Sequence, residues 1–313
     1  MKVNGGGIAQ PAIGLVGFGR WGRHIFRDLR ALGATVHVAV PGDASRQAAA
    51  EAGAASVQAN LSALPEVDGY MVATPTATHA QVIAALLARN RPIFVEKPLT
   101  NDVDAARHLV EQAADRLFVM DKWRYHPGIR ALAQQARSGA LGEILAVRTL
   151  RLGWDNPHRD VDAVWILLPH DLSIVLEILG ALPAAQAAFS TVPGRPGSDL
   201  IAVLHDGPGS AQVTIEVSSH HPTSRRAVVV VGTKGVAQLP DSYDDRILTA
   251  AGVPGEMTSK PTDIAVGGEM PLLLELEAFV AHLRGGPPPR SSAREGLMIV
   301  ERIHALRRLA GLP

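Results

Sequence analysis

A glycine-rich turn between an apolar segment and an amphipathic segment limits the folds open to this chain more than any other feature. Residues 12–16 are apolar and predict a buried strand, and residues 23–32 carry apolar side chains at helical spacing. Between them, residues 17–22 spell Gly-Phe-Gly-Arg-Trp-Gly, a G-x-G-x-x-G pattern. A strand, this pattern and a helix in succession are typical of a dinucleotide-binding turn, although the same glycines could form a purely structural turn.

The spacing of the glycines gives each of them a role in a dinucleotide-binding turn. Gly17 allows the tight bend, Gly19 lets the backbone approach a pyrophosphate, and Gly22 allows the helix to pack closely on the strand. We therefore predict cofactor contacts along the whole turn, which comprises Gly17, Phe18, Gly19, Arg20, Trp21 and Gly22.

Short apolar segments then alternate with helical patterns. We predict strands over residues 36–40, 68–73, 93–95 and 117–120, and helices over residues 80–88 and 103–114. Repeated alternation of this kind predicts a doubly wound parallel sheet, so we expect an α/β Rossmann domain over residues 1–121.

After Asp121 the pattern changes to longer alternating and β-branched segments. We predict strands over residues 144–150, 200–205, 211–218, 226–231, 236–239 and 246–249, and helices over residues 129–138, 168–179, 270–283 and 294–309. This pattern predicts an α+β domain over residues 122–313 with an open, mainly antiparallel sheet. We leave open whether the C-terminal helix packs back on the first domain.

Composition excludes several classes of function. Thirty basic residues balance thirty acidic ones, so a basic surface for nucleic acid is not expected. The chain has no cysteine, which excludes disulfides and thiolate metal sites, and no His, Asp or Glu spacing suggests a catalytic metal. Polar residues interrupt the apolar run over residues 161–182, and residues 1–10 lack a signal-peptide core, so we expect a cytoplasmic protein without a membrane span.

The end of the second predicted strand lacks the acidic residue that usually binds the ribose hydroxyls of NAD. Pro41 and Gly42 occupy that place, and Asp43 follows two residues late. Arg46 could bind the 2′-phosphate of NADP or could be a surface charge on a helix. Either NAD or NADP is compatible with this sequence, with a slight preference for NADP.

Two more predicted strands end in polar residues at the edge of the sheet where ligands bind. Thr74 and Pro75 follow one of them, with His79 shortly after, and Glu96 and Lys97 follow the other. We expect all five near the cofactor. For His79 the alternative is a structural histidine, and for Lys97 it is a solvated surface lysine.

A polar pair interrupts the apolar helix of the second half. His170 and Asp171 follow Pro169, and this order predicts that the helix begins there with Asp171 as its cap. His170 would then be either a core histidine or a residue that faces the substrate. Arg124 and His158 are further candidates for substrate binding, and both could equally be surface residues.

Several of these stretches together resemble one family, the Gfo/Idh/MocA oxidoreductases. They are residues 17–22, residues 73–75 with His79, residues 96–98, residues 124–127, and Trp165 with residues 169–174. The resemblance implies a Rossmann domain that binds NAD or NADP and a C-terminal domain that supports the substrate. It also implies that Lys97 and His170 flank the nicotinamide. The last stretch looks most like the sugar and nucleotide-sugar dehydrogenase branches.

One position departs from the pattern of this family. Members commonly carry an aspartate four residues before the histidine, and that position here is Ile166. In the family this aspartate helps to bind substrate hydroxyls or assists proton transfer. Either the substrate differs, or Asp160, Asp162 or Asp171 takes over, or the activity is reduced or lost.

The function that the resemblance implies is hydride transfer between a nicotinamide and a secondary alcohol or ketone of a sugar, nucleotide sugar or cyclitol. His170 suits proton transfer near neutral pH, Lys97 would hydrogen-bond the reacting oxygen or share the base role, and Asp171 would help to bind the substrate. The alternatives are a non-catalytic dinucleotide-binding protein, an imine reductase and a redox-assisted glycosidase. A homodimer or homotetramer through the C-terminal sheet is expected.

Overall fold

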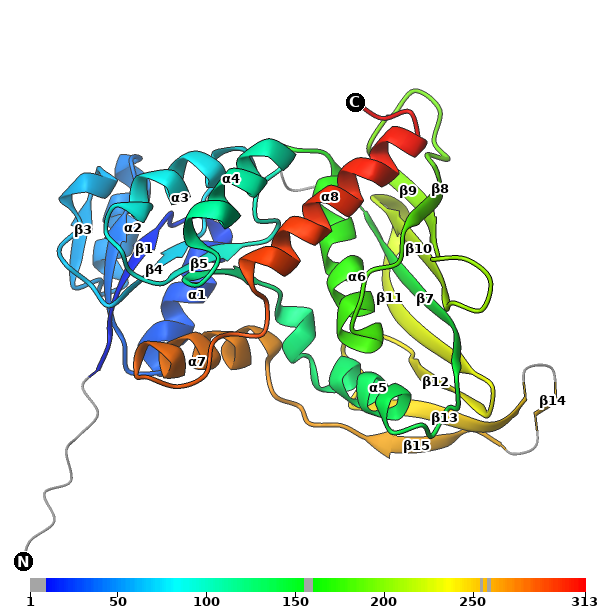
Figure 1. The fold of residues 1–313 in the computed structure, drawn as a ribbon. Helices are drawn as coiled ribbons and strands as arrows, with labels where there is room; N and C mark the ends of the chain where they lie inside the picture. The colour runs from blue at the N-terminus through cyan, green and yellow to red at the C-terminus, as the bar shows by residue number, and fades with distance from the viewer. Residues whose placement is uncertain (1–9, 155–159, 254–255, 258–259) are drawn as a thin grey trace, which may run out of the picture.

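Two sheets, each with its own helices, make up the molecule (Figure 1). The structure is a computed structural model and describes residues 10–154, 160–253, 256–257 and 260–313. His158, a predicted substrate contact, lies outside the described residues. Within the described part of the chain, no helix is long and apolar enough to cross a membrane.

The first sheet has six parallel strands in the order β3-β2-β1-β4-β5-β6. The strands are β1 (Ala12–Val16), β2 (Thr35–Ala39), β3 (Ser56–Gln58), β4 (Gly69–Val72), β5 (Ile93–Glu96) and β6 (Leu117–Met120). The strand order reverses between β1 and β4, and this reversal opens the crevice where ligands bind in such sheets. The predicted Rossmann architecture is therefore confirmed.

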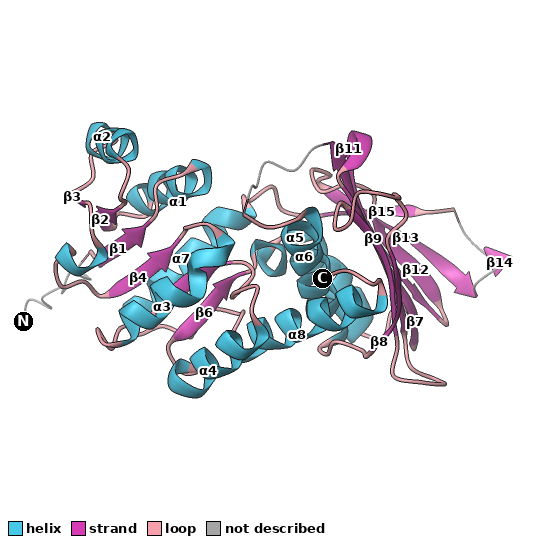
Figure 2. Cartoon of the chain, turned by 90° about the horizontal axis from the view of Figure 1, so that it is seen from above, coloured by secondary structure: helices cyan, strands magenta, loops and turns pink. Residues whose placement is uncertain are grey.

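Helices cover both faces of this sheet (Figure 2). They are α1 (Arg20–Ala31), α2 (Asp43–Glu51), α3 (His79–Leu87) and α4 (Val103–Ala113), with short 3-10 turns η1 (Leu61–Ala63), η2 (Thr76–Thr78) and η3 (Lys122–Tyr125). The sequence did not predict β3 or α2. β3 has only three residues, all half-buried, and α2 buries only Ala49, so neither carries a strong periodic pattern.

The second sheet has nine strands and is mainly antiparallel, as predicted; β7 and β10 form its one parallel pair among the described strands. The strands are β7 (Ile144–Trp154), β8 (Ala185–Phe189), β9 (Asp199–Leu204), β10 (Gln212–Ser218), β11 (His220–Gly232), β12 (Gly235–Leu239), β13 (Arg246–Val253), β14 (Glu256–Met257) and β15 (Thr262–Ala265). Among the described helices, α5 (Pro127–Arg137), α6 (Ala163–Leu179) and α8 (Ala293–Leu309) lie on one face of this sheet (Figure 2).

Helix α6 begins earlier than the sequence predicted. Asp162 is its N-cap, and the Asp162 carboxylate accepts a hydrogen bond of 3.2 Å from the Trp165 backbone N–H. Pro169 lies inside the helix, and Asp171 does not cap it. The prediction failed because residues 163–168 are an apolar turn that packs in the core, and this burial outweighs the missing N–H of the proline.

The last two helices join the two halves. Helix α7 (Pro271–Leu283) enters the core of the first sheet, where the ring of Phe279 lies 5.0 Å from that of Phe94. Helix α8 contacts α4 and β6 on one side and α6 and β8 on the other. A capping box between Ser292 and Glu295 fixes the start of α8.

Candidate active site

The glycine turn forms an open cradle at the start of α1. Gly17 has φ +97°, and a Cβ on it would lie 2.4 Å from the carbonyl oxygen of Ala73. Gly19 is the N-cap of α1 and has no side chain to occupy the first N–H groups, while a Cβ on it would meet nothing within 4 Å. The first turn also lacks an acidic residue. Free N–H groups at a positive helix end fit the pyrophosphate of a dinucleotide.

The side chains of the turn divide between the core and the crevice. Phe18 is buried and packs edge-on against Phe26, so only its backbone is available to a cofactor. Arg20 and Trp21 are in the first turn of α1. The ring of Trp21 lies under the ammonium of Lys122, at 4.6 Å, so it connects the turn with η3.

Arg46 lies at the end of β2, where the sequence predicts a contact with the ribose of a dinucleotide. Its guanidinium contacts the carboxylate of Asp43 and the carbonyl oxygen of Pro41, which holds it at the end of β2. The side chain of Asp43 is 93% exposed. The two predicted residues therefore form one exposed ion pair at this position.

His79 braces two loops rather than facing a ligand. Its ring is buried, and its two nitrogens lie 2.9 Å from the carbonyl oxygen of Pro98 and 3.0 Å from that of Thr74. Burial lowers the pKa of this imidazole. The neutral ring has one N–H and donates to one of these two carbonyl groups, and it lies between the segments that follow β4 and β5.

Lys97 reaches from the first sheet to the second domain. It follows β5 directly, the Lys97–Pro98 peptide bond is cis, and the side chain is buried. Its ammonium donates a 3.1 Å hydrogen bond to the backbone carbonyl of Ile166 on α6. Burial lowers the pKa of Lys97 to about 8, and the positive charge of Lys122 adds to this, while Glu96 opposes it. A substantial fraction of the lysine is therefore neutral at mildly alkaline pH.

His170 lies one helical turn after Ile166, on the same face of α6. Its Nδ1 is buried and has no hydrogen-bond partner among the described residues. Burial, followed by the charge of Lys97, lowers the pKa of His170 well below its ordinary value. The imidazole is therefore neutral at pH 7 and a weak base, so Lys97 is better suited to take up a proton than the sequence suggested.

The sequence did not predict two buried carboxyl groups, Asp121 beside Lys97 and Glu275 on α7. Asp121 follows β6, is 1% exposed, and neither of its carboxylate oxygens has a partner in the described part of the chain. Burial raises its pKa to about 7 against the charges of Arg124 and Lys97. Burial also raises the pKa of Glu275 on α7 and that of Glu96. Asp121 directly follows a predicted parallel strand, and this position could have indicated it as a site residue from the sequence.

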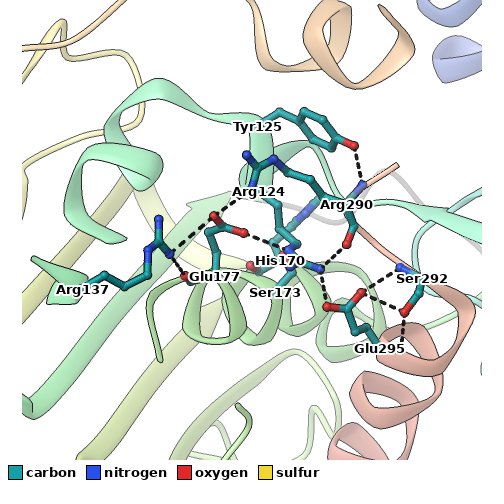
Figure 3. A network of polar contacts seen from close by, with 9 residues as sticks. All are labelled: Arg124, Tyr125, Arg137, His170, Ser173, Glu177, Arg290, Ser292 and Glu295. Carbon is teal, nitrogen blue, oxygen red and sulfur yellow. Dashed lines mark hydrogen bonds and ion pairs between the residues drawn. The ribbon is translucent and has the colours of Figure 1, made fainter. Parts of the chain in front are cut away.

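Arg124 is held in a network of ion pairs and hydrogen bonds (Figure 3). Its Nε donates to Glu177 at 3.1 Å, and its Nη1 lies 2.9 Å from both Glu295 and the carbonyl oxygen of Arg290. The backbone N–H of Arg290 in turn donates to the hydroxyl of Tyr125 at 2.8 Å. The structure therefore gives Arg124 a bracing role among η3, α6 and α8.

The carboxylates that could replace the aspartate at position 166 differ in availability. Asp171 is buried and pairs with Arg151 at 2.5 Å, and Asp162 pairs with Arg307 at 2.7 Å. Asp160 is exposed and accepts a 3.3 Å hydrogen bond from the Ala77 backbone N–H, beside the end of β4. Asp160 is therefore the one of the three that retains a solvent-facing carboxylate near the crevice.

Two family models match the chain. The model described as "Oxidoreductase family, NAD-binding Rossmann fold" matches residues 12–119, and the "GFO/IDH/MocA C-terminal domain" matches residues 129–238. The chain is 30% identical to inositol 2-dehydrogenase of Ralstonia nicotianae over 91% of this chain and 89% of that protein. It is 29% identical to the enzyme of the same name from Pseudomonas fluorescens over 91% and 90%.

Solved structures share the fold. UDP-N-acetylglucosamine 3-dehydrogenase from Acidithiobacillus ferrooxidans superposes with a TM-score of 0.83 at 21% identity, over 96% of this chain and 98% of that one. A levoglucosan dehydrogenase in complex with NADH and levoglucosan superposes with a TM-score of 0.84 at 17% identity, over 97% and 98%.

Proposed function

The chain belongs to the GFO/IDH/MocA oxidoreductase family, and we propose that it transfers a hydride between NAD(P) and a secondary alcohol or ketone of a sugar, nucleotide sugar or cyclitol. The observation that carries this proposal is the buried Lys97, which extends from the end of β5 to α6 and approaches the face of α6 that bears His170. The substrates named for the related dehydrogenases support the chemical class.

In this proposal the bound nicotinamide supplies the hydride chemistry, and the protein positions the substrate and moves the proton. When an alcohol is oxidised, Lys97 accepts the hydroxyl proton, and in the reverse direction it returns that proton. Its pKa of about 8 suits both directions near neutral pH. His170, as a neutral imidazole, hydrogen-bonds the same oxygen and fixes its position. The proton-transfer role thus moves from His170, favoured by the sequence, to Lys97.

We propose that NADP is accepted at least as well as NAD. The support is the position of Arg46, which lies at the end of β2 beside Asp43 and can meet a 2′-phosphate. The ratio of the dissociation constants of NADPH and NADH, measured by fluorescence titration, tests this preference.

The proposal extends to domains and assembly. We assign cofactor binding to residues 1–121 and substrate binding to residues 122–313, with α7 contributing to the core of the first part. A second copy of the chain would cover the face of the large sheet that the described helices leave free (Figure 2). Large exposed side chains such as Trp154 and Phe189 lie on strands of this sheet. Light scattering in solution measures the number of copies.

A lysine variant tests the catalytic assignment. Lys97→Ala should bind NAD(P)H nearly as well as the wild type and lose at least about a thousandfold in turnover, because proton transfer is removed while the glycine turn is intact. Lys234→Ala, an exposed lysine between β11 and β12, is the matched control and should retain full activity.

The outcome separates the candidate functions. Full turnover in Lys97→Ala would refute the proposed mechanism. A wild-type protein that binds NAD(P)H but turns over no sugar or cyclitol in a screen would favour a non-catalytic dinucleotide-binding protein, which Ile166 alone supports.

A further inference from the structure

Two arginines lie side by side in the large sheet. Arg151 on β7 is the direct partner of Arg226 on β11 in an antiparallel pair. Side chains of directly opposed residues emerge on the same face, and two like charges in this arrangement repel each other. The shared face is the one toward α6, because the guanidinium of Arg151 lies 2.5 Å from the carboxylate of Asp171 on that helix.

Among the described residues, only one of the two arginines forms an ion pair. The charge of Arg226 still acts on the same Asp171 carboxylate at longer range. Arg151 is buried, pairs with Asp171, and lies over the ring of Trp123 at 4.4 Å. Arg226 is half-buried, and no described carboxylate forms an ion pair with its guanidinium. Asp241 accepts a 3.3 Å hydrogen bond from the backbone N–H of Arg226 rather than from its side chain.

Arg226 lies on the sheet face next to the candidate active site, beside Arg151. Trp123 connects the two places, since its ring contacts Arg151 and also lies 6.2 Å from the ring of His170. Burial lowers the pKa of His170 most, and the positive charges of Lys97, Arg151, Lys122 and Arg226 lower it further. Arg226 therefore contributes to a positive potential at the reacting end of the crevice.

The carboxyl groups at this end of the crevice are buried or paired. Asp171 is paired with Arg151. The three buried acids of the first-domain side have raised pKa values, namely Glu96, Asp121 and Glu275. Position 166 on α6 is an isoleucine and adds no negative charge. The second-domain wall thus offers the guanidinium of Arg226, which forms no ion pair with a described carboxylate.

We propose that the substrate carries an anionic group, a carboxylate or a phosphate, which binds the guanidinium of Arg226. This inference rests on the proposed function and specifies its substrate class. The fork of a guanidinium matches the two oxygens of a carboxylate or phosphate, and binding of that group would relieve the repulsion between Arg151 and Arg226. An acidic sugar or a sugar phosphate therefore fits this wall better than a neutral sugar.

Binding to the NADH-loaded enzyme tests the proposal, because it does not require turnover. The probes are D-glucuronate and D-glucose 6-phosphate, each compared with D-glucose, in calorimetric titrations. The variants are Arg226→Gln, and Arg225→Gln as the matched control, since Arg225 is the exposed neighbour on the opposite face of the strand. Arg226→Lys retains the positive charge but not the two-pronged guanidinium. It allows the test to be read even if the glutamine variant does not fold.

We expect at least one acid to bind roughly 10- to 100-fold more tightly than D-glucose, as one charge-assisted hydrogen-bonded pair allows. Arg226→Gln should remove this difference and leave the affinity for D-glucose unchanged, Arg226→Lys should retain part of it, and Arg225→Gln should retain all of it. The acid whose affinity falls in Arg226→Gln shows whether the anionic group is a carboxylate or a phosphate.

The inference is overturned if neither acid binds more tightly than D-glucose, or if Arg226→Gln binds the acids as well as the wild type does. Either result leaves the proposed function standing, provided that NADH binds and turnover depends on Lys97. Failure of those two properties instead refutes the proposed function itself.

Discussion

Replacement of Asp121 by asparagine should stabilise the protein, and increasingly so as the pH rises. The carboxyl group is 1% exposed and unpartnered within the described residues, and its pKa is about 7 rather than 3.8. At pH values between these two pKa values, the Asp121 carboxyl group keeps its proton in the folded protein and loses it in the unfolded chain. The cost of ionising Asp121 therefore appears as the pH rises through this window, and an amide of the same shape removes that cost.

The size of the effect follows from the two pKa values. A difference of about three units corresponds to roughly 4 kcal/mol in the free energy of unfolding at a pH above both, at about 1.36 kcal/mol per unit. At pH 5 only about a third of this cost is present, since the folded state still holds its proton. Asp121→Asn should therefore gain roughly 2–3 kcal/mol relative to the wild type between pH 5 and pH 8.

Urea unfolding at pH 5 and pH 8, followed by circular dichroism, measures this gain. Asp115→Asn is the control, because the Asp115 side chain is 83% exposed and its replacement should change stability equally at both pH values. The negative charge of Asp121 also raises the pKa of Lys97, so the rise of oxidation rate with pH should move to lower pH in Asp121→Asn. The same stability difference from the wild type at both pH values would refute the reasoning.

Three further variants test other parts of the site. Gly19→Val should abolish NAD(P)H binding in a fluorescence titration, because the side chain fills the cradle at the start of α1; retained affinity would contradict the assignment of the turn. Glu177→Leu should lower the free energy of unfolding by about 3 kcal/mol in urea, since it leaves the buried Arg124 short of a partner, and an unchanged midpoint would argue against the bracing role. Arg46→Ala should weaken NADPH about tenfold and NADH little; equal losses for both would remove the 2′-phosphate contact.

Features encoded in adjacent residues could be predicted from the sequence. The turn around Gly17 and Gly19 is such a feature, because its strand, glycines and helix follow one another directly. Lys97 is another, since an apolar strand that ends in a charged residue indicates the ligand-binding edge of a parallel sheet. These two features also fix the fold class and the cofactor class.

Features that depend on pairing between distant segments could not be predicted in this way. Arg226 becomes a candidate only because strand pairing brings it opposite Arg151. The register of that pairing cannot be derived from the sequence of either strand. The ion pairs of Arg124 connect η3 with residues far along the chain, so its candidacy for substrate binding could be judged only in three dimensions. Local cap rules favoured Asp171 over Asp162, whereas core packing decided where α6 begins.

The packing of α7 determines when the cofactor-binding half can be completed during synthesis. A nascent chain that has reached residue 121 contains all six strands of the first sheet but lacks Leu276 and Phe279, which fill the core beside Phe94. That apolar surface stays uncovered until the ribosome has made nearly the whole protein. The segment that forms the large sheet is therefore synthesised before the core of the first sheet is complete, and an exchange of residues 1–121 between relatives would have to include α7 to keep that core intact.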